Sequence, residues 1–127
     1  MSDVIRISEQ GKRQLIALKR STKIDQWNIL CRWALCTSLQ DTSPIRNLSL
    51  GPMSNVEMTW ETFAGKHHSL FIALLKEKNQ FSKNKEEAEK NYIAQALVHI
   101  HRGIQILAHK KPEISDLIKT AKPTESN

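Results

Sequence analysis

The chain has 127 residues, which is the size of one ordinary domain and too short for an enzyme with a cleft between two lobes. Lysine and arginine outnumber aspartate and glutamate by 19 to 13, so the net charge of +6 favours a polyanionic partner such as nucleic acid or an anionic membrane surface. Only 4 glycines and 4 prolines interrupt the chain, which indicates long helices and argues against extensive disorder.

The first predicted elements are a short extended segment and a helix. Residues 4–7 form a β-branched run, and the following Ser8 is a good N-cap residue for a helix. Glu9 then falls in the first turn, where the helix dipole favours an acid. We expect this helix to run to about Arg20.

A second helix is predicted from Asp25, which can cap it, to about Leu39. Its apolar side chains follow the spacing of a buried stripe: Trp27, Leu30, Cys31, Ala34 and Leu35. Cys31 and Cys36 are five residues apart, so they point about 140° away from each other on this helix. We therefore expect two free thiols.

The middle of the chain combines loop chemistry with a stretch that has two readings. Residues 40–54 contain two prolines, a glycine and many short polar residues, which predicts a long loop. Apolar and polar residues then alternate over 56–60, which is typical of a strand. Thr59 as an N-cap and Gly65 after a C-terminus would equally bracket one helical turn.

Two further helices complete the prediction. The third carries Leu70, Phe71, Leu74 and Leu75 on one face and ends near Lys78, and the fourth begins in the acidic stretch at 86–89 and runs to about Lys110. We expect a compact, mainly helical (all-α) domain of four helices over residues 1–111, with a flexible tail over 112–127. No signal peptide or membrane span is evident in the sequence, so a cytoplasmic location is expected.

The N-terminal half, with a strand followed by two helices in 39 residues, has the order of a ribbon-helix-helix arrangement. In that arrangement two chains pair their strands and insert them into the major groove of DNA, which would turn Arg6 toward the bases. The alternative is that residues 4–7 form an edge segment packed on the core of their own chain.

Basic residues gather in two clusters that we predict to contact DNA. The first cluster spans residues 12–23 without an acid and contains Lys12, Arg13, Lys19, Arg20 and Lys23. The second contains Lys76, Lys78, Lys83 and Lys85, of which we predict Lys83 and Lys85 to contact DNA, and it is diluted by the neighbouring acids at 86–89. Paired with backbone phosphates, such residues bind with little sequence preference.

No residue pattern predicts catalysis, a metal or a cofactor. The chain has no nucleophile motif and no glycine-rich phosphate loop. His99 and His101 lie about 200° apart around a helix, which does not suit one metal ion. A cluster of Glu57, Glu61 and His67 is the alternative for a catalytic site, although such polar residues usually decorate a solvated surface.

Three segments carry a family resemblance over about residues 4–110. They are RISEQGKRQLIALKRSTKIDQWNILCRWALCTSL, EMTWETFAGKHHSLFIALLKEK and ALVHIHRGIQIL. Their most specific parts are residues 30–36, then Trp60 with Phe63 and Gly65, and then residues 101–103. In these segments the chain resembles the DndE family of bacterial DNA phosphorothioation systems.

The resemblance implies a small helical protein that forms a homotetramer and binds double-stranded DNA, preferably nicked, through surface lysines. It implies work alongside DndB, DndC and DndD, with sulfur originating at the cysteine desulfurase DndA, in replacing a non-bridging phosphate oxygen by sulfur. A nicking activity has also been associated with the family. The family's turn between the first two helices often contains glycine and is associated with assembly, whereas residues 21–23 here read Ser-Thr-Lys.

Overall fold

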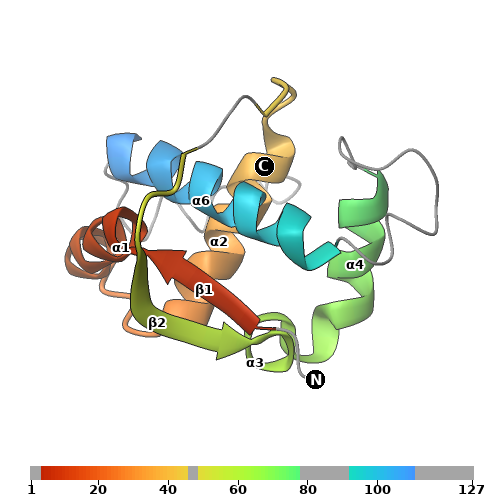
Figure 1. Ribbon diagram of the computed structural model, residues 1–127, viewed down its shortest axis with the longest axis horizontal. Helices are drawn as coiled ribbons and strands as arrows, with labels where there is room; N and C mark the ends of the chain where they lie inside the picture. The colour runs from red at the N-terminus through yellow and green to blue at the C-terminus, as the bar shows by residue number, and fades with distance from the viewer. Residues whose placement is uncertain (1–3, 46–48, 78–91, 111–127) are drawn as a thin grey trace, which may run out of the picture.

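The chain folds into a mainly helical domain, as predicted, and it also has a small two-stranded sheet that the prediction did not include (Figure 1). The computed structural model describes residues 4–45, 49–77 and 92–110. In chain order the elements are strand β1 (Val4–Ser8), helices α1 (Glu9–Thr22) and α2 (Trp27–Gln40), strand β2 (Met53–Thr59), helix α3 (Trp60–Ala64), the 3-10 turn η1 (Gly65–His67), and helices α4 (His68–Glu77) and α6 (Tyr92–Lys110).

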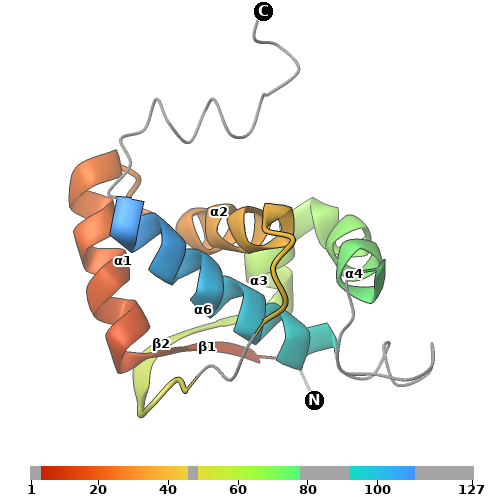
Figure 2. The same cartoon turned by 90° about the horizontal axis from the view of Figure 1, so that it is seen from above.

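The crossing of α2 and α6 forms the centre of the fold (Figure 2). Leu30 and Ala34 of α2 and Ile100 and Ile104 of α6 are all fully buried. Gly103 lets the helices approach closely, because a Cβ atom at this position would lie 1.7 Å from the carbonyl oxygen of Ala34. The two backbones are therefore in contact at this point.

The two strands pair antiparallel within the same chain. Val4 lies opposite Thr59 and Arg6 opposite Glu57, and the register shifts between Arg6 and Ser8. Ile5 and Ile7 are completely buried, so the opposite face of β1 carries its exposed residues. The predicted order of strand, helix and helix in the N-terminal half is confirmed. Residues 4–7 pair with β2 of the same chain, which agrees with the alternative in which they form an edge segment on their own core.

Helix α1 is fixed at both ends. The Ser8 side chain accepts a hydrogen bond from the Gly11 amide at 3.0 Å, which confirms Ser8 as the N-cap. At the other end Lys23 adopts a left-handed conformation with φ 65° and donates its amide to the Lys19 carbonyl. A side chain in this conformation carries a cost that glycine avoids. Lys23 thus occupies a position that favours glycine.

The prediction that Asp25 caps α2 is wrong. The N-cap is Gln26, whose side chain makes no capping hydrogen bond. Asp25 lies one residue before the cap, and its carboxylate is 3.6 Å from the Lys19 ammonium. The Asp25 carboxylate thus lies near the Lys19 ammonium and does not cap α2. Both cysteines of α2 are free, as expected.

Both readings of residues 56–65 are found, one after the other. Strand β2 ends at Thr59, and the Thr59 hydroxyl then accepts the Thr62 amide at 3.1 Å as the N-cap of α3. Gly65 ends α3 with φ 58°, where a Cβ atom would lie 3.2 Å from the Arg32 guanidinium. A single residue therefore ends the strand and starts the helix.

The last two helices agree with the prediction where the structure describes them. Helix α4 ends at Glu77, and α6 ends at Lys110. The predicted start of the fourth helix in the acidic stretch and the predicted tail over 112–127 lie outside the described residues. Within the described ranges, the helices are too short or too polar to span a membrane.

Candidate nucleic-acid interface

Helix α1 presents an exposed basic face. Arg13 and Arg20 are both exposed and seven residues apart, which places them roughly 10 Å apart along the axis and at nearly the same angle around it. Ala17 lies between them and is also exposed. Neither arginine has an ion pair with a described residue. Two guanidinium groups with a small residue between them can therefore approach a flat, anionic surface together.

Two other cations of the first cluster are engaged within the chain. The Lys12 ammonium donates a hydrogen bond to the Asn55 side chain at 2.8 Å. The Lys19 ammonium lies 4.3 Å from the centroid of the Trp27 ring, in addition to its contact with Asp25. Such contacts hold the side chains against the surface. We therefore rank Lys12 and Lys19 below the arginines as contacts for a phosphate.

The remaining predicted cations fall into two groups. Lys23 is exposed at the C-terminal end of α1, so it extends the face formed by Arg13 and Arg20. Lys83 and Lys85 lie outside the described residues, and their contribution stays a prediction. We name the surface of Arg13, Arg20 and Lys23 the α1 basic face.

Arg6 has a partner on the neighbouring strand. Its guanidinium forms an ion pair with the Glu57 carboxylate, and both side chains are about half exposed. The exposed face of the sheet therefore carries a neutralised pair at this position. A reading in which Arg6 contacts bases would require this pair to open.

A serine and a histidine come together at the α2 and α6 crossing. The Ser38 hydroxyl lies 2.8 Å from His99 Nδ1, and Arg102 Nε donates to the same hydroxyl at 2.7 Å. Ser38 is completely buried and His99 is 2% exposed. Because the hydroxyl is buried and bonded on two sides, this pair joins helices and does not meet a substrate.

Arg102 also binds the C-terminal end of α2. Its guanidinium donates to the carbonyl oxygens of Ser38 at 2.7 Å, Asp41 at 3.3 Å and Ser43 at 2.8 Å. The last carbonyl groups of a helix lack partners within that helix. Arg102 supplies them, so it anchors the end of α2 and the following loop.

His101 connects α6 to the junction of β1 and α1. The Ser8 amide donates to His101 Nε2 at 3.0 Å, so Nδ1 carries the proton and donates to the Leu97 carbonyl at 2.7 Å. Burial lowers the pKa of the imidazole below its ordinary value. His101 is therefore neutral in the folded protein and has a structural role.

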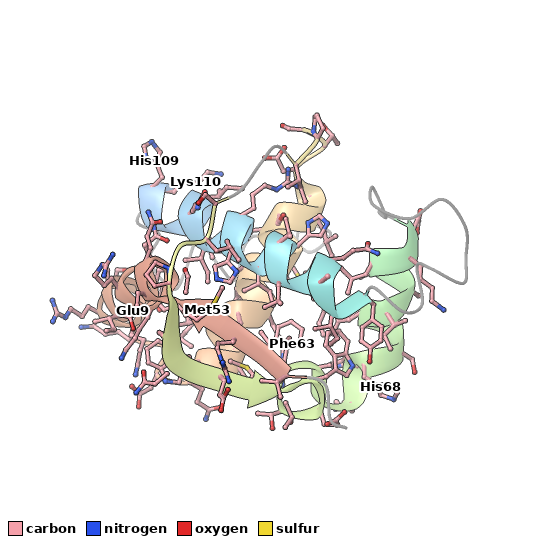
Figure 3. All side chains as sticks on the ribbon, viewed as in Figure 1. Glu9, Met53, Phe63, His68, His109 and Lys110 are labelled. Carbon is pink, nitrogen blue, oxygen red and sulfur yellow. The ribbon has the colours of Figure 1, made fainter. Side chains whose placement is uncertain are left out.

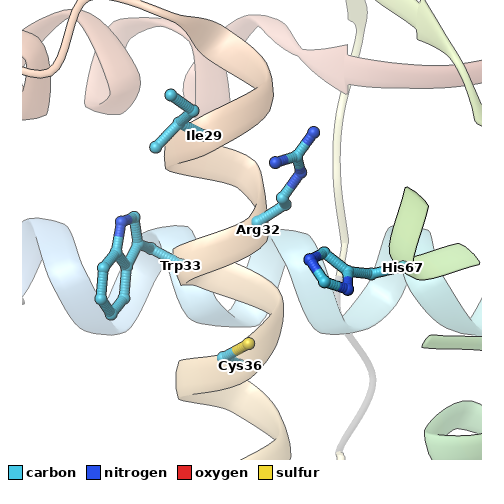
Figure 4. Close-up of a pocket in the computed structure, with 5 residues that line it drawn as sticks. All are labelled: Ile29, Arg32, Trp33, Cys36 and His67. Atoms are coloured by element: carbon cyan, nitrogen blue, oxygen red, sulfur yellow. The ribbon is translucent and has the colours of Figure 1, made fainter. Parts of the chain in front are cut away.

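A groove follows the outer side of α2, on the surface opposite α6 (Figure 4). It is lined by Ile29, Arg32, Trp33, Cys36 and His67, with Trp33 on one side and His67 on the other, and has a volume of about 390 Å³. The sequence did not predict that these residues share one site. A signal was present, because Ile29, Trp33 and Cys36 are apolar residues outside the predicted core stripe of the same helix.

Two residues that line the groove are the cation Arg32, which is held in place, and the uncharged thiol Cys36. Arg32 donates Nε to the Phe63 carbonyl and approaches the Thr62 carbonyl at 3.4 Å, so α3 holds its guanidinium in place. Burial raises the pKa of the Cys36 thiol above its ordinary value, which keeps this side chain protonated.

Figure 3 shows Phe63 pointing into the interior, whereas His68 points outward at the start of α4.

The alternative catalytic cluster is not assembled. Glu57 pairs with Arg6, and His67 lines the groove of α2. Over residues 4–45, 49–77 and 92–110, no three histidine, cysteine or acidic side chains lie together as metal ligands. The described part of the chain thus offers the α1 basic face and the groove as its candidate sites.

The comparisons with known proteins agree on one family. The family model described as DNA sulphur modification protein DndE matches residues 4–115. A crystal structure of a DndE mutant involved in DNA phosphorothioation has a similar fold, with a TM-score of 0.61 and 22% sequence identity over 86% of this chain and 99% of the other. No curated protein sequence gives a significant match.

Proposed function

The chain belongs to the DndE family of DNA sulphur modification proteins, and we propose that it serves DNA phosphorothioation by holding double-stranded DNA, with a preference for nicked duplex. The observation that carries this proposal is the α1 basic face. Arg13 and Arg20 are exposed on α1 and Lys23 is exposed at its C-cap, and within the described residues none of them is in an ion pair. Contacts of these cations with backbone phosphates release counterions and give binding with little sequence preference.

We further propose that the protein acts as a homotetramer. One chain carries a formal charge of +6, and a symmetric assembly would present several α1 basic faces to one DNA molecule. Several weak contacts made together raise the overall affinity through a high effective concentration. A nick favours such binding, because a broken strand removes much of the cost of bending duplex DNA, which is about 1–6 kcal/mol.

Family membership also suggests the partners and the place of this activity. We propose that the chain works with DndB, DndC and DndD in the cytoplasm. The alternative is a scaffold subunit that acts mainly through protein partners. The groove of α2 is the feature that favours this alternative, because partly exposed apolar side chains, Ile29, Trp33 and Cys36, gather in it.

The double variant Arg13→Gln/Arg20→Gln tests DNA binding by the α1 basic face. For each α1 basic face that contacts the duplex we expect about 30-fold weaker binding, since each phosphate contact contributes about 1 kcal/mol. The slope of log K against log salt should fall by about 1.8 for each such face, because each contact contributes about 0.9. Gel shifts or fluorescence anisotropy at several salt concentrations measure both quantities.

Three matched variants make this result specific. Arg6→Gln removes an arginine that is paired with Glu57, so affinity should stay unchanged. Lys12→Gln/Lys19→Gln should weaken binding less than the arginine pair, because both lysines have partners within the chain. Lys83→Gln/Lys85→Gln measures the second predicted cluster. Normal affinity and salt slope in the arginine pair would reject the α1 basic face as the DNA contact.

We also propose that the protein does not cleave DNA by itself. The support is that the Ser38 and His99 pair is buried at the helix crossing. Supercoiled plasmid incubated with the purified protein and Mg²⁺ should remain supercoiled at every protein concentration. Open circles that increase with protein, and that persist through successive purification steps at constant specific activity, would establish a nicking enzyme instead.

A further inference from the structure

The groove of α2 presents flat side chains that suit a nucleobase. The indole of Trp33, the guanidinium of Arg32 and the imidazole of His67 line this groove, with Trp33 on one side of α2 and the other two on the opposite side in Figure 4. Aromatic rings and arginine planes are the groups on which proteins stack unpaired bases. The groove volume of about 390 Å³ falls in the range of ligand pockets. Groups of this kind, gathered in one groove, indicate a flat, aromatic ligand.

The surroundings of the groove are basic. Lys66 and His68 flank His67 and are exposed, and none of the residues that line the groove is acidic. Figure 2 shows the outer side of α2 between the C-terminal end of α1 and the start of α4. Residues 23–26 alone connect α1 to α2, so the groove begins close to Lys23 of the α1 basic face. A phosphate chain bound at this face would run beside the groove.

We propose that the groove binds an unstacked nucleobase at the strand end of a nicked duplex, with Trp33 as the stacking surface and Arg32 and His67 opposite it. This inference rests on the proposed binding of DNA. A base in intact duplex is paired and stacked on both sides, whereas a base at a nick leaves the stack at lower cost. The groove would therefore distinguish nicked from intact DNA, while the α1 basic face binds both.

A second copy of the chain is the rival occupant of the groove. A two-fold interface brings the same surface patch of both copies together. Such an interface would bring Arg32 and Lys66 of both copies into one contact patch. Like charges at close range oppose this contact. A polyanionic strand has the opposite charge, so charge complementarity favours DNA.

The test compares the variants Trp33→Ala and Trp33→Phe on three duplexes of one sequence: intact, nicked, and nicked with one unpaired 2-aminopurine at the strand end. We expect Trp33→Ala to bind the two nicked duplexes about tenfold more weakly and the intact duplex normally, since stacking contributes at this level for each base. Trp33→Phe keeps an aromatic ring and should retain most of the affinity. Leu70→Ala, which trims an exposed leucine outside the groove, is the control.

Fluorescence of 2-aminopurine reports stacking directly, and its decrease on binding of the wild-type protein needs no variant. It should fall when the wild-type protein binds and should stay high with Trp33→Ala. Unchanged fluorescence with wild-type protein, or an unchanged preference for nicked DNA in a folded Trp33→Ala protein, overturns the inference and leaves DNA binding by the α1 basic face intact. Equal loss on all duplexes, with a smaller mass in sedimentation, assigns the groove to a second copy. Failure of wild-type protein to bind any duplex rejects the proposed function itself.

Discussion

A Gly103→Ala variant should lose more than about 3 kcal/mol of folding free energy, which is a large part of the stability of a small domain. Helix propensity alone would make this substitution favourable by about 1 kcal/mol. The close contact with α2 reverses the sign, because the added Cβ atom would lie 1.7 Å from the Ala34 carbonyl oxygen. The backbone of α2 cannot rotate away as a flexible side chain can. Urea unfolding followed by circular dichroism measures the loss.

Ala94→Gly is the matched control for this prediction. Ala94 is exposed on the same helix, so removal of its methyl group should cost only about 1 kcal/mol of helix propensity. A Gly103→Ala protein as stable as the wild type would show that α2 and α6 do not cross at backbone contact.

Replacing Arg102 by leucine should destabilise the domain by about 3 kcal/mol, which corresponds to a fall of roughly 10 °C in the melting temperature. The substitution removes the donors to the Ser38 hydroxyl and to three carbonyl oxygens at the end of α2. The Ser38 carbonyl keeps the Asp41 amide as a donor at 3.1 Å, whereas the Ser43 carbonyl loses its hydrogen bond from Arg102. Thermal unfolding followed by circular dichroism measures the effect.

The variant Arg102→Lys separates charge from geometry. Lysine keeps the positive charge but lacks the planar fork of donors, so we expect a loss between those of the wild type and Arg102→Leu. Lys110→Ala removes an exposed cation from the end of the same helix and should change stability by less than about 0.5 kcal/mol. An Arg102→Lys protein with wild-type stability would mean that charge alone holds the end of α2.

The sequence predicted the helices well because each depends on its own periodicity. Residues 27–40 and 92–110 carry apolar stripes that need no knowledge of a partner, and Ser8 could be identified as a cap from its position. The pairing of β1 with β2 was less accessible, since it joins segments about 50 residues apart. The prediction that Asp25 caps α2 failed for a similar reason, because its partner Lys19 lies on α1, a different element.

The candidate site was predicted in part. The sequence located the cations of residues 12–23 on one helix, but it could not show that Lys12 and Lys19 have partners within the chain. Those partners, Asn55 and Trp27, lie on β2 and α2. The groove of α2 was missed for a related reason, because residue 67 joins residues 29–36 only through the tertiary fold.

The most specific segments of the family resemblance are mainly structural in this fold. His101 accepts the Ser8 amide, Arg102 anchors α2, and Gly103 permits the helix crossing. Trp60 and Phe63 pack against each other in the core. The resemblance therefore covers the scaffold, and its residues 30–36 also include Arg32, Trp33 and Cys36 of the groove. The residues proposed to contact DNA lie on its exterior, in α1 and on the outer side of α2.

The bond from Ser8 to His101 links positions that are 93 residues apart. During synthesis β1 and the start of α1 leave the ribosome long before α6 is made. The Ser8 amide therefore cannot donate to His101 until α6 has been synthesised. Contacts of such long sequence separation slow folding. Until nearly the whole domain has been translated, Ile5 and Ile7 lack part of their native core and are open to non-native contacts. Completion of this core is thus a late event in the folding of the domain.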